Sequence, residues 1–111
     1  MESLEDWKKI LKEMSSQNRV CILVEGKRDF AKLSSFNIQN IYTLKGKRFY
    51  DVVEEIIENC DLCIILFDLD KHGEKMTQKF QQLLSSEGVE IDTSFREFLR
   101  NFNIEEIENI P

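Results

Sequence analysis

The sequence predicts an α/β fold in which a central, mostly parallel sheet of about four strands is covered by helices on both faces, as a three-layer sandwich. Two observations support this prediction. Continuous apolar runs of strand length occur at residues 19–25 and 61–70, and they are rich in the β-branched residues that buried strands favour. Stretches with apolar residues at helical spacing separate these runs. Strands that alternate with helices form right-handed βαβ units, so we expect the strands to be parallel.

The first expected element is an amphipathic helix at residues 3–16. Leu4, Trp7 and Leu11 recur at helical spacing within it. Ser3 is a suitable N-cap, because its hydroxyl oxygen can accept a hydrogen bond from a free backbone N–H of the first turn. The apolar side of this helix is expected to lie against the core.

The first strand, residues 19–25, is followed directly by a turn and a helix. Gly26 permits a tight turn, and residues 27–36 then carry Phe30, Leu33 and Phe36 at helical spacing, which indicates a helix with these residues on its inner side. A second short strand follows at residues 40–44. The order of strand, helix and strand is that of one βαβ unit.

The second half of the chain continues the alternation of helices and strands. Residues 49–59 carry an apolar stripe opposite acidic side chains, which indicates an amphipathic helix. The third strand, residues 61–70, is followed by a helix at residues 73–84 that ends before Gly88. The remaining elements are a short strand at residues 88–92, a helix from about residue 94 to residue 100, and one or two turns near the C-terminus.

The length and composition indicate one folded domain. The 111 residues fit the commonest domain size, and a content of 41% hydrophobic and 32% charged residues is typical of a globular protein. We expect a single domain that consists of an N-terminal helix (1–18), a core (19–92) and a C-terminal helical segment (93–111).

The sequence contains no segment typical of export or membrane insertion. No apolar run approaches the roughly 20 residues that span a bilayer, and the N-terminus lacks the basic and apolar regions of a signal peptide. We therefore expect a cytoplasmic protein with no membrane partner. Its three cysteines, Cys21, Cys60 and Cys63, are then expected to be reduced and buried rather than disulfide-bonded.

Three carboxylates follow the expected strands. Glu25 ends the first strand, and Asp68 and Asp70 end the third. Parallel strands have their carboxyl ends at one edge of the sheet, so these side chains are expected to gather there, with the α-carbons of the two aspartates roughly 6.6 Å apart. Such hard oxygen ligands suit Mg²⁺ or Mn²⁺. The residues also leave open a structural role, in which Asp68 caps the following turn and Asp70 is only solvated.

Basic residues cluster after the same strands. The net charge of −6 argues against binding of a polyanion by overall charge. A basic collar around an acidic metal site nevertheless suits a phosphate-bearing substrate, although exposed loops are commonly basic without such a role. The basic residues that follow the three strands are Lys27, Arg28, Lys32, Lys45, Lys47, Arg48, Lys71, Lys75 and Lys79.

Two segments resemble motifs of the Toprim family. ILVEGKRDF, residues 22–30, is similar to the first motif, an apolar strand followed by Glu-Gly and by an Asp three residues after the Gly. IILFDLDKHGEKM, residues 64–76, is similar to the second motif, an apolar strand followed by DxDxxG and a helix. The resemblance implies a Mg²⁺-dependent fold shared by the catalytic cores of bacterial primases, topoisomerases, recombination and repair proteins, and small ribonucleases that mature ribosomal RNA.

The resemblance also implies roles for individual residues. Glu25 would be a general acid/base or a metal ligand, Asp68 and Asp70 would be metal ligands and catalytic residues, and Asp29 would be a secondary acid near the centre. The glycines of the strand-to-helix turns would be Gly26, Gly46 and Gly73. The residues expected to contact nucleic-acid phosphates are Lys27, Arg28, Lys45, Lys47, Arg48 and Lys71.

The leading hypothesis is a protein that uses Mg²⁺, or Mn²⁺, to act on phosphodiesters of RNA or DNA, as a nuclease or an RNA-processing enzyme. The main alternative is a non-catalytic module that binds nucleic acid or a nucleotide within a larger nucleic-acid-processing assembly. The sequence leaves open whether the protein is an enzyme, its oligomeric state, and whether Arg96 and Arg100 contact phosphate. A phosphatase-like aspartate phosphotransferase is less favoured, because FDLD is followed by Lys71 and His72 rather than by Gly-Thr.

Overall fold

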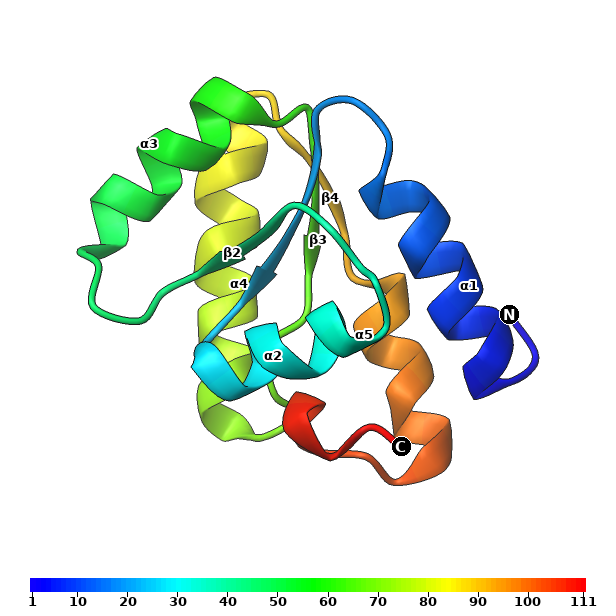
Figure 1. The fold of residues 1–111 in the computed structure, drawn as a ribbon. Coiled ribbons are helices and arrows are strands. Elements are labelled where there is room, and N and C mark those ends of the chain that lie inside the picture. The colour runs from blue at the N-terminus through cyan, green and yellow to red at the C-terminus, as the bar shows by residue number, and fades with distance from the viewer.

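The computed structural model describes all residues from Met1 to Pro111. Its centre is a four-stranded sheet in the order β2-β1-β3-β4, and every neighbouring pair of strands is parallel (Figure 1). This arrangement confirms the predicted α/β fold with a parallel sheet. The strands are β1 (Val20–Val24), β2 (Ile41–Thr43), β3 (Leu62–Ile65) and β4 (Glu90–Asp92).

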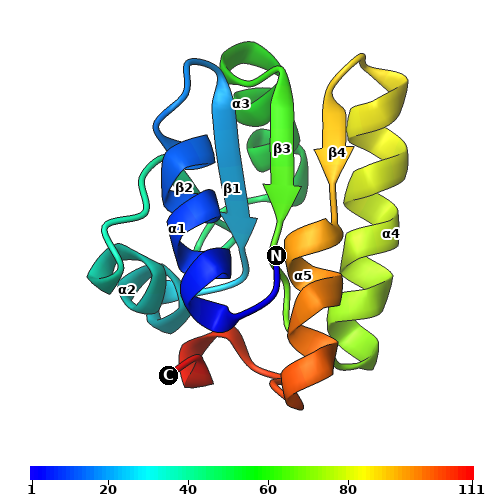
Figure 2. The ribbon, with the colours of Figure 1, turned by 90° about the vertical axis from the view of Figure 1, so that its right-hand side faces the viewer.

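Five α-helices and two short 3₁₀-helices cover both faces of this sheet (Figure 2). They are α1 (Leu4–Ser15), α2 (Lys27–Ser35), α3 (Phe49–Asn59), α4 (Lys71–Ser86), α5 (Ser94–Phe98), η1 (Leu99–Phe102) and η2 (Ile107–Asn109). One apolar cluster lies between the sheet and α1, α2, α5 and the 3₁₀-helices, and includes Trp7 and Phe95. The other lies between the sheet and α3 and α4, and includes Val52 and Phe80. The protein therefore has the predicted three layers.

The side chains of β1 explain why the sheet has two apolar faces. All five residues of β1 are buried. Ile22 and Val24 belong to the first apolar cluster, whereas Cys21 and Leu23 belong to the second. This alternation follows from the two-residue period of a strand. A strand with apolar residues at every position must be covered on both sides, as its continuous apolar sequence predicted.

The strand order changes direction between β1 and β3. From β1 the chain forms β2 on one side, and it then forms β3 on the other side of β1. The segments that leave the carboxyl ends of β1 and β3 consequently lead to helices on opposite faces of the sheet, α2 and α4. In open α/β sheets, ligands bind at this point. Glu25 directly follows β1, and Asp68 lies just beyond β3.

Two predictions of local structure were wrong. The third strand was expected to reach residue 70, but regular pairing ends at Ile65 and α4 already begins at Lys71. Leu66 still donates a backbone hydrogen bond to Leu23, and beyond it the carbonyl oxygens of Phe67 and Asp68 accept hydrogen bonds from a side chain, as described below. Phe30 was expected to face the core and is 43% exposed. Leu33 is buried as its spacing predicted, and Asp29, four residues earlier, is buried on the same side of α2 in place of Phe30.

The three cysteines are free and buried, which agrees with the prediction. Cys21 and Cys63 are partners in the register of β1 and β3, and Cys60 directly precedes this end of the sheet. A hydrogen bond with Cys21 and burial both raise the pKa of the Cys60 thiol. Buried thiols with raised pKa values are chemically inert, which favours a structural role.

None of the helices is both long enough and apolar enough to cross a membrane.

Candidate functional site

The candidate site lies at the carboxyl ends of β1 and β3, where three loops meet. One loop follows β1 and starts α2, and the second follows β3 and starts α4. The third is the C-terminal segment, whose Ile107 backbone N–H donates a hydrogen bond to Asp68 Oδ1 over 3.0 Å. The sequence predicted that the first two loops would meet, and it gave no indication of the third.

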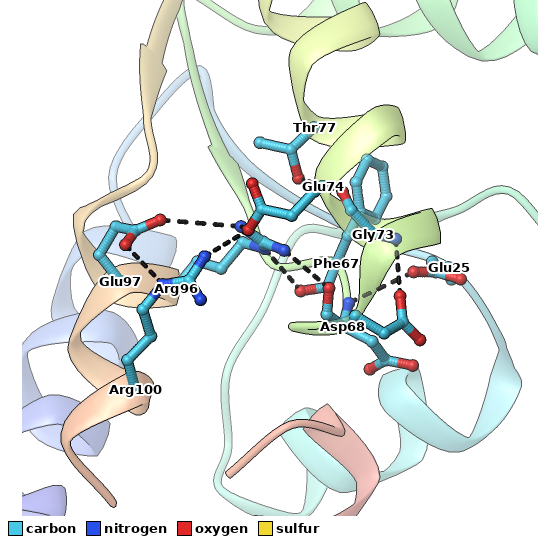
Figure 3. Close-up of polar contacts among 10 residues, drawn as sticks. Glu25, Phe67, Asp68, Gly73, Glu74, Thr77, Arg96, Glu97 and Arg100 are labelled. Atoms are coloured by element: carbon cyan, nitrogen blue, oxygen red, sulfur yellow. Dashed lines mark hydrogen bonds and ion pairs between the residues drawn. The ribbon is translucent and has the colours of Figure 1, made fainter. Parts of the chain in front are cut away.

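Glu25 connects the first two loops. Its half-buried carboxylate accepts a hydrogen bond from the backbone N–H of Asp68, with 3.3 Å between Asp68 N and Glu25 Oε1 (Figure 3). The second oxygen, Oε2, lies 4.0 Å from His72 Nε2. Burial, followed by the negative charge of Asp68, raises the pKa of Glu25. The carboxyl group therefore binds a proton more readily than an ordinary surface glutamate does.

Asp68 is held by the C-terminal segment and carries an unbalanced charge. Its Oδ1 accepts the hydrogen bond from Ile107, which leaves Oδ2 without a hydrogen-bond donor from the protein. Burial raises the pKa of Asp68, and the charges of Asp70 and Glu108 raise it further. A cation placed among these carboxylates would relieve the repulsion between them.

Asp70 has a structural role that the sequence analysis assigned to the other aspartate. It is the N-cap of α4, where its Oδ1 accepts a hydrogen bond from the backbone N–H of Gly73 over 2.7 Å. The proposal that Asp68 caps this turn while Asp70 is only solvated was therefore wrong. The second carboxylate oxygen of Asp70 is not used by the cap.

Asp29 is placed at the same edge by the start of α2. Its side chain is buried, and its Oδ2 accepts a hydrogen bond from the backbone N–H of Gly26 over 3.1 Å. Burial raises the pKa of Asp29, and the charge of Asp68 also raises it. Asp29 thus belongs to the same electrostatic cluster as Glu25 and Asp68.

These acids and several basic residues line one cleft of about 540 Å³ that contains no hydrophobic lining residue. Lys45 lies at one side of it, and Arg28 Nη1 lies 3.8 Å from Glu108 Oε2. The complete lining consists of Glu25, Gly26, Lys27, Arg28, Asp29, Lys45, Asp68 and Glu108. A polar cleft with both signs of charge suits a metal ion together with a phosphate group.

Not all predicted site residues reach this cleft. Asp70, Lys47, Arg48 and Lys71 are absent from its lining. Lys47 is instead paired with Glu55, with 3.6 Å between Lys47 Nζ and a carboxylate oxygen. Asp70, Arg48 and Lys71 are exposed.

The predicted turn glycines differ in what they contribute. Gly46 has φ +72°, a left-handed conformation that favours glycine. Gly73 lies so close to the backbone that an added Cβ would be 1.7 Å from the carbonyl oxygen of Asp68. Gly26 has φ −141°, a conformation that any residue adopts.

The sequence left open whether Arg96 contacts phosphate, and it did not identify Glu108 as a residue of the cleft. Arg96 is 1% exposed and donates hydrogen bonds to the carbonyl oxygens of Phe67 and Asp68. Arg100 is paired with Glu74 and Glu97. The position of Arg96 between two apolar residues at helical spacing, Phe95 and Leu99, was the available signal for burial; Phe95 lies in α5 and Leu99 begins η1. Nothing in the local sequence of Glu108 indicates that it faces the cleft.

The side chains at this edge provide suitable donors for Mg²⁺, although they are not gathered around one point. No group of three or more His, Cys, Asp or Glu side chains is arranged so that it could hold a metal ion in this conformation. The chemistry of the donor atoms does fit a metal ion. In each of the three carboxylates, one oxygen accepts a hydrogen bond from a backbone N–H and the second oxygen accepts none; these residues are Glu25, Asp68 and Asp70. Oxygen donors with unbalanced negative charge are those that Mg²⁺ prefers.

Comparisons with known proteins identify the family of the chain. The family model of the Toprim domain matches residues 20–101, so the chain belongs to the Toprim domain family. Toprim domains typically bind Mg²⁺.

Two archaeal proteins indicate to which group of Toprim proteins the chain belongs. A UPF0292 protein of Pyrococcus horikoshii is 30% identical over 89 residues, which cover 80% of this chain and 67% of the relative. A UPF0292 protein of Methanosarcina barkeri is 27% identical over 111 residues, which cover 99% of this chain and 77% of the relative. The chain is thus a Toprim protein of the UPF0292 family.

Solved structures show the same fold. A protein from Aquifex aeolicus is similar with a TM-score of 0.91 and 46% sequence identity over 99% of this chain and 100% of that one. The Aquifex aeolicus primase, solved as its zinc-binding and RNA polymerase domains, is similar with a TM-score of 0.60 and 28% identity. That match covers 86% of this chain and 25% of the primase, so the likeness concerns one part of a much larger protein.

Proposed function

We propose that this protein binds Mg²⁺ through Glu25, Asp68 and Asp70 and acts on phosphodiesters of RNA or DNA, as a nuclease or an RNA-processing enzyme. The observation that carries the proposal is the cleft that combines Glu25, Asp29 and Asp68, all with raised pKa values, with basic side chains. Carboxylates that repel one another beside lysine and arginine are typical of a site for a divalent cation and a phosphate.

Each residue has a distinct part in this proposal. Bound Mg²⁺ would supply charge neutralisation on the phosphate. Lys27, Arg28 and Lys45 would bind phosphate oxygens from the wall of the cleft. Where Glu25 does not ligate the ion, it would hold or move a proton at Oε2, the oxygen that faces His72, because its raised pKa brings it closer to the range in which a general acid or base is effective.

A second candidate function is a non-catalytic module that binds a nucleic acid or nucleotide in a metal-dependent manner. The arrangement of the carboxylates favours it, because they surround the edge without converging on a common point. Efficient metal catalysis needs ligands held close to their working geometry, whereas docking tolerates a looser set. The two candidates differ in whether Mg²⁺ changes a rate or only an affinity.

The experiment compares the wild type with the double variant Asp68→Asn/Asp70→Asn. Mg²⁺ and Mn²⁺ are titrated into both proteins by calorimetry, and cleavage of structured RNA and DNA is then assayed. A control variant, Asp51→Asn/Asp61→Asn, removes the same two charges from exposed positions away from the cleft. It should bind the ions as the wild type does.

The outcomes separate the two candidates. Metal binding and cleavage that are both lost in the site variant support the enzyme. Metal binding that is lost in the variant, with no cleavage by the wild type, supports the binding module. A wild type that binds neither ion, even with nucleic acid present, contradicts both.

A further inference from the structure

Arg96 is the one lysine or arginine that the fold buries. Its side chain is 1% exposed and lies between α5 and the segment that joins β3 to α4 (Figure 3). A buried guanidinium destabilises the fold unless its N–H groups find acceptors and its charge finds a partner. The contacts of Arg96 show what it holds in place.

The guanidinium of Arg96 contacts the segment that carries the two aspartates. Nε donates to the carbonyl oxygen of Phe67 over 2.9 Å, and Nη2 donates to the carbonyl oxygen of Asp68 over 2.8 Å. Nη1 donates to Glu74 Oε1, on the first turn of α4, over 2.7 Å. One planar group therefore joins the end of β3 to the start of α4. Only the fixed fork of an arginine offers donors for all three acceptors at once.

Gly73, in the first turn of α4, packs closely against the carbonyl group of Asp68. The space beside the Asp68 carbonyl would be filled by any Cβ at position 73. The N–H of Gly73 donates to Asp70 Oδ1, and its carbonyl oxygen accepts a hydrogen bond from Thr77 Oγ1 over 2.7 Å. The backbone of residues 67–70 is thus fixed by Arg96 and by the first turn of α4 together.

We propose that Arg96 is a positioning residue for the metal site: by binding the carbonyls of Phe67 and Asp68 it sets the direction in which the carboxylates of Asp68 and Asp70 point. This inference rests on the proposed function, because it gives Arg96 its role through those two ligands. Arg96 does not reach the cleft and makes no contact with phosphate in this role. Groups that orient metal ligands contribute to metal affinity without touching the ion.

The test is the variant Arg96→Lys, which keeps the charge and loses the fork. Mn²⁺ affinity is measured by electron paramagnetic resonance of the free ion. We expect the affinity to fall by about tenfold or more, in the range typical for loss of a group that orients ligands. Hydrogen exchange at the amides of Asp68 and Gly73 should accelerate in the metal-free protein, which is a readout that needs no metal.

A control variant separates positioning from general destabilisation. Phe95→Leu changes the neighbouring core residue of α5, whose ring packs on Trp7 and which forms no hydrogen bond with residues 67–70. It should lower the thermal stability while Mn²⁺ affinity stays at the wild-type value. If Phe95→Leu and Arg96→Lys lose affinity in proportion to their loss of stability, the role of Arg96 is only structural and the inference is overturned.

The remaining outcomes are also decisive. Mn²⁺ affinity of Arg96→Lys within about twofold of the wild type overturns the inference about Arg96 and leaves the proposed function intact. A wild type that binds no Mn²⁺ overturns the proposed function and the positioning role with it. Should circular dichroism show that Arg96→Lys does not fold, Glu74→Gln replaces it. That variant removes one of the two charged partners of Arg96, whose Nη1 also lies 3.7 Å from Glu97 Oε1. Unchanged Mn²⁺ affinity despite faster hydrogen exchange at the amide of Asp68 would then overturn the inference.

Discussion

The two ends of β3 carry two clusters of titratable side chains, and the fold treats them in opposite ways. At the amino end, Cys21, Cys60 and Cys63 are enclosed in the core with 3% exposure or less. At the carboxyl end, Glu25 and Asp68 are only half-buried, and their pKa values are raised by burial and by neighbouring charges. The cysteines contribute packing, whereas the carboxylates retain a repulsion that the fold does not relieve. Such unrelieved charge distinguishes a candidate functional site from a structural cluster.

The largest expected effect is the loss of stability caused by Gly73→Ala, which disturbs the segment at the carboxyl end of β3. The new Cβ would collide with the backbone carbonyl of Asp68, at 1.7 Å in the present geometry. We expect the free energy of unfolding to fall by at least about 3 kcal/mol, measured by urea denaturation. Gly26→Ala is the control, since its Cβ would meet nothing closer than Asp29 Oδ2 at 4.0 Å; it should lose less than about 1 kcal/mol. Equal losses for the two variants would contradict the close approach at Gly73.

A smaller effect is expected at the amino end from Cys63→Ala. The side chain of Cys63 is fully buried, so its removal leaves a small cavity and should lower the free energy of unfolding by about 1 kcal/mol. Mn²⁺ affinity should not change, because the substitution lies at the far end of the strand. A weakened affinity in a folded Cys63→Ala protein would show that the two ends are coupled.

Asp68→Asn should have the opposite effect on stability in the metal-free protein. The asparagine can still accept the Ile107 hydrogen bond through Oδ1, while the repulsion with Glu25 and Asp70 is removed. We expect a gain of about 0.5 kcal/mol at pH 7, which allows for solvent screening of a half-exposed group. Mn²⁺ binding, measured on the same sample, should be strongly weakened. A loss of stability instead would show that the charge of Asp68 is already balanced by the fold.

The smallest expected effect is the pH dependence of stability. The pKa values of Glu25, Asp29 and Asp68 are raised in the folded state. Between the ordinary carboxyl pKa of about 4 and these raised values, the folded protein therefore binds more protons than the unfolded chain. The contribution of these groups to the free energy of unfolding should fall as the pH rises through this window. Saturating Mg²⁺ should reduce this fall.

Glu74 should contribute with the opposite sign. Hydrogen bonds from Arg96, and the charge of that residue, lower the pKa of Glu74, so its contribution is present above the pKa of the unfolded chain and is lost as the pH falls. Urea denaturation from pH 3 to pH 7 would resolve both changes in the free energy of unfolding: the fall toward higher pH from Glu25, Asp29 and Asp68, and the fall toward lower pH from Glu74. In Asp68→Asn the fall toward higher pH should become shallower, and the fall toward lower pH should persist. An unchanged fall toward higher pH would contradict the assignment to Asp68.

The sequence predicted those features that depend on local patterns. The apolar stripe of residues 49–59 corresponds to α3 with the same ends, and the apolar run after Arg19 gave β1 to within one residue at each end. The meeting of Glu25 and Asp68 followed from the rule that parallel strands end at one edge. In each case, one segment and one geometric rule were sufficient.

The features that the sequence did not predict depend on contacts between distant segments. Regular pairing of β3 ends at Ile65. The carbonyl oxygens of Phe67 and Asp68 accept hydrogen bonds from Arg96, which is 29 and 28 residues away in the sequence. Asp68 is bound by Ile107, 39 residues away, and that contact leaves the capping position to Asp70. Such contacts have no local pattern, so no spacing rule could have found them. The assignment of metal ligands and phosphate contacts stays a prediction.

The enclosure of all three cysteines has a practical consequence for labelling. The native cysteines are 3% exposed or less, so we expect a thiol-reactive reagent to react with them slowly in the folded protein. A single cysteine introduced by Tyr50→Cys, at a side chain that is 68% exposed, would therefore take up a spin label or a fluorophore without removal of the native thiols. The distance from that label to a paramagnetic Mn²⁺ ion would then locate the ion directly in solution.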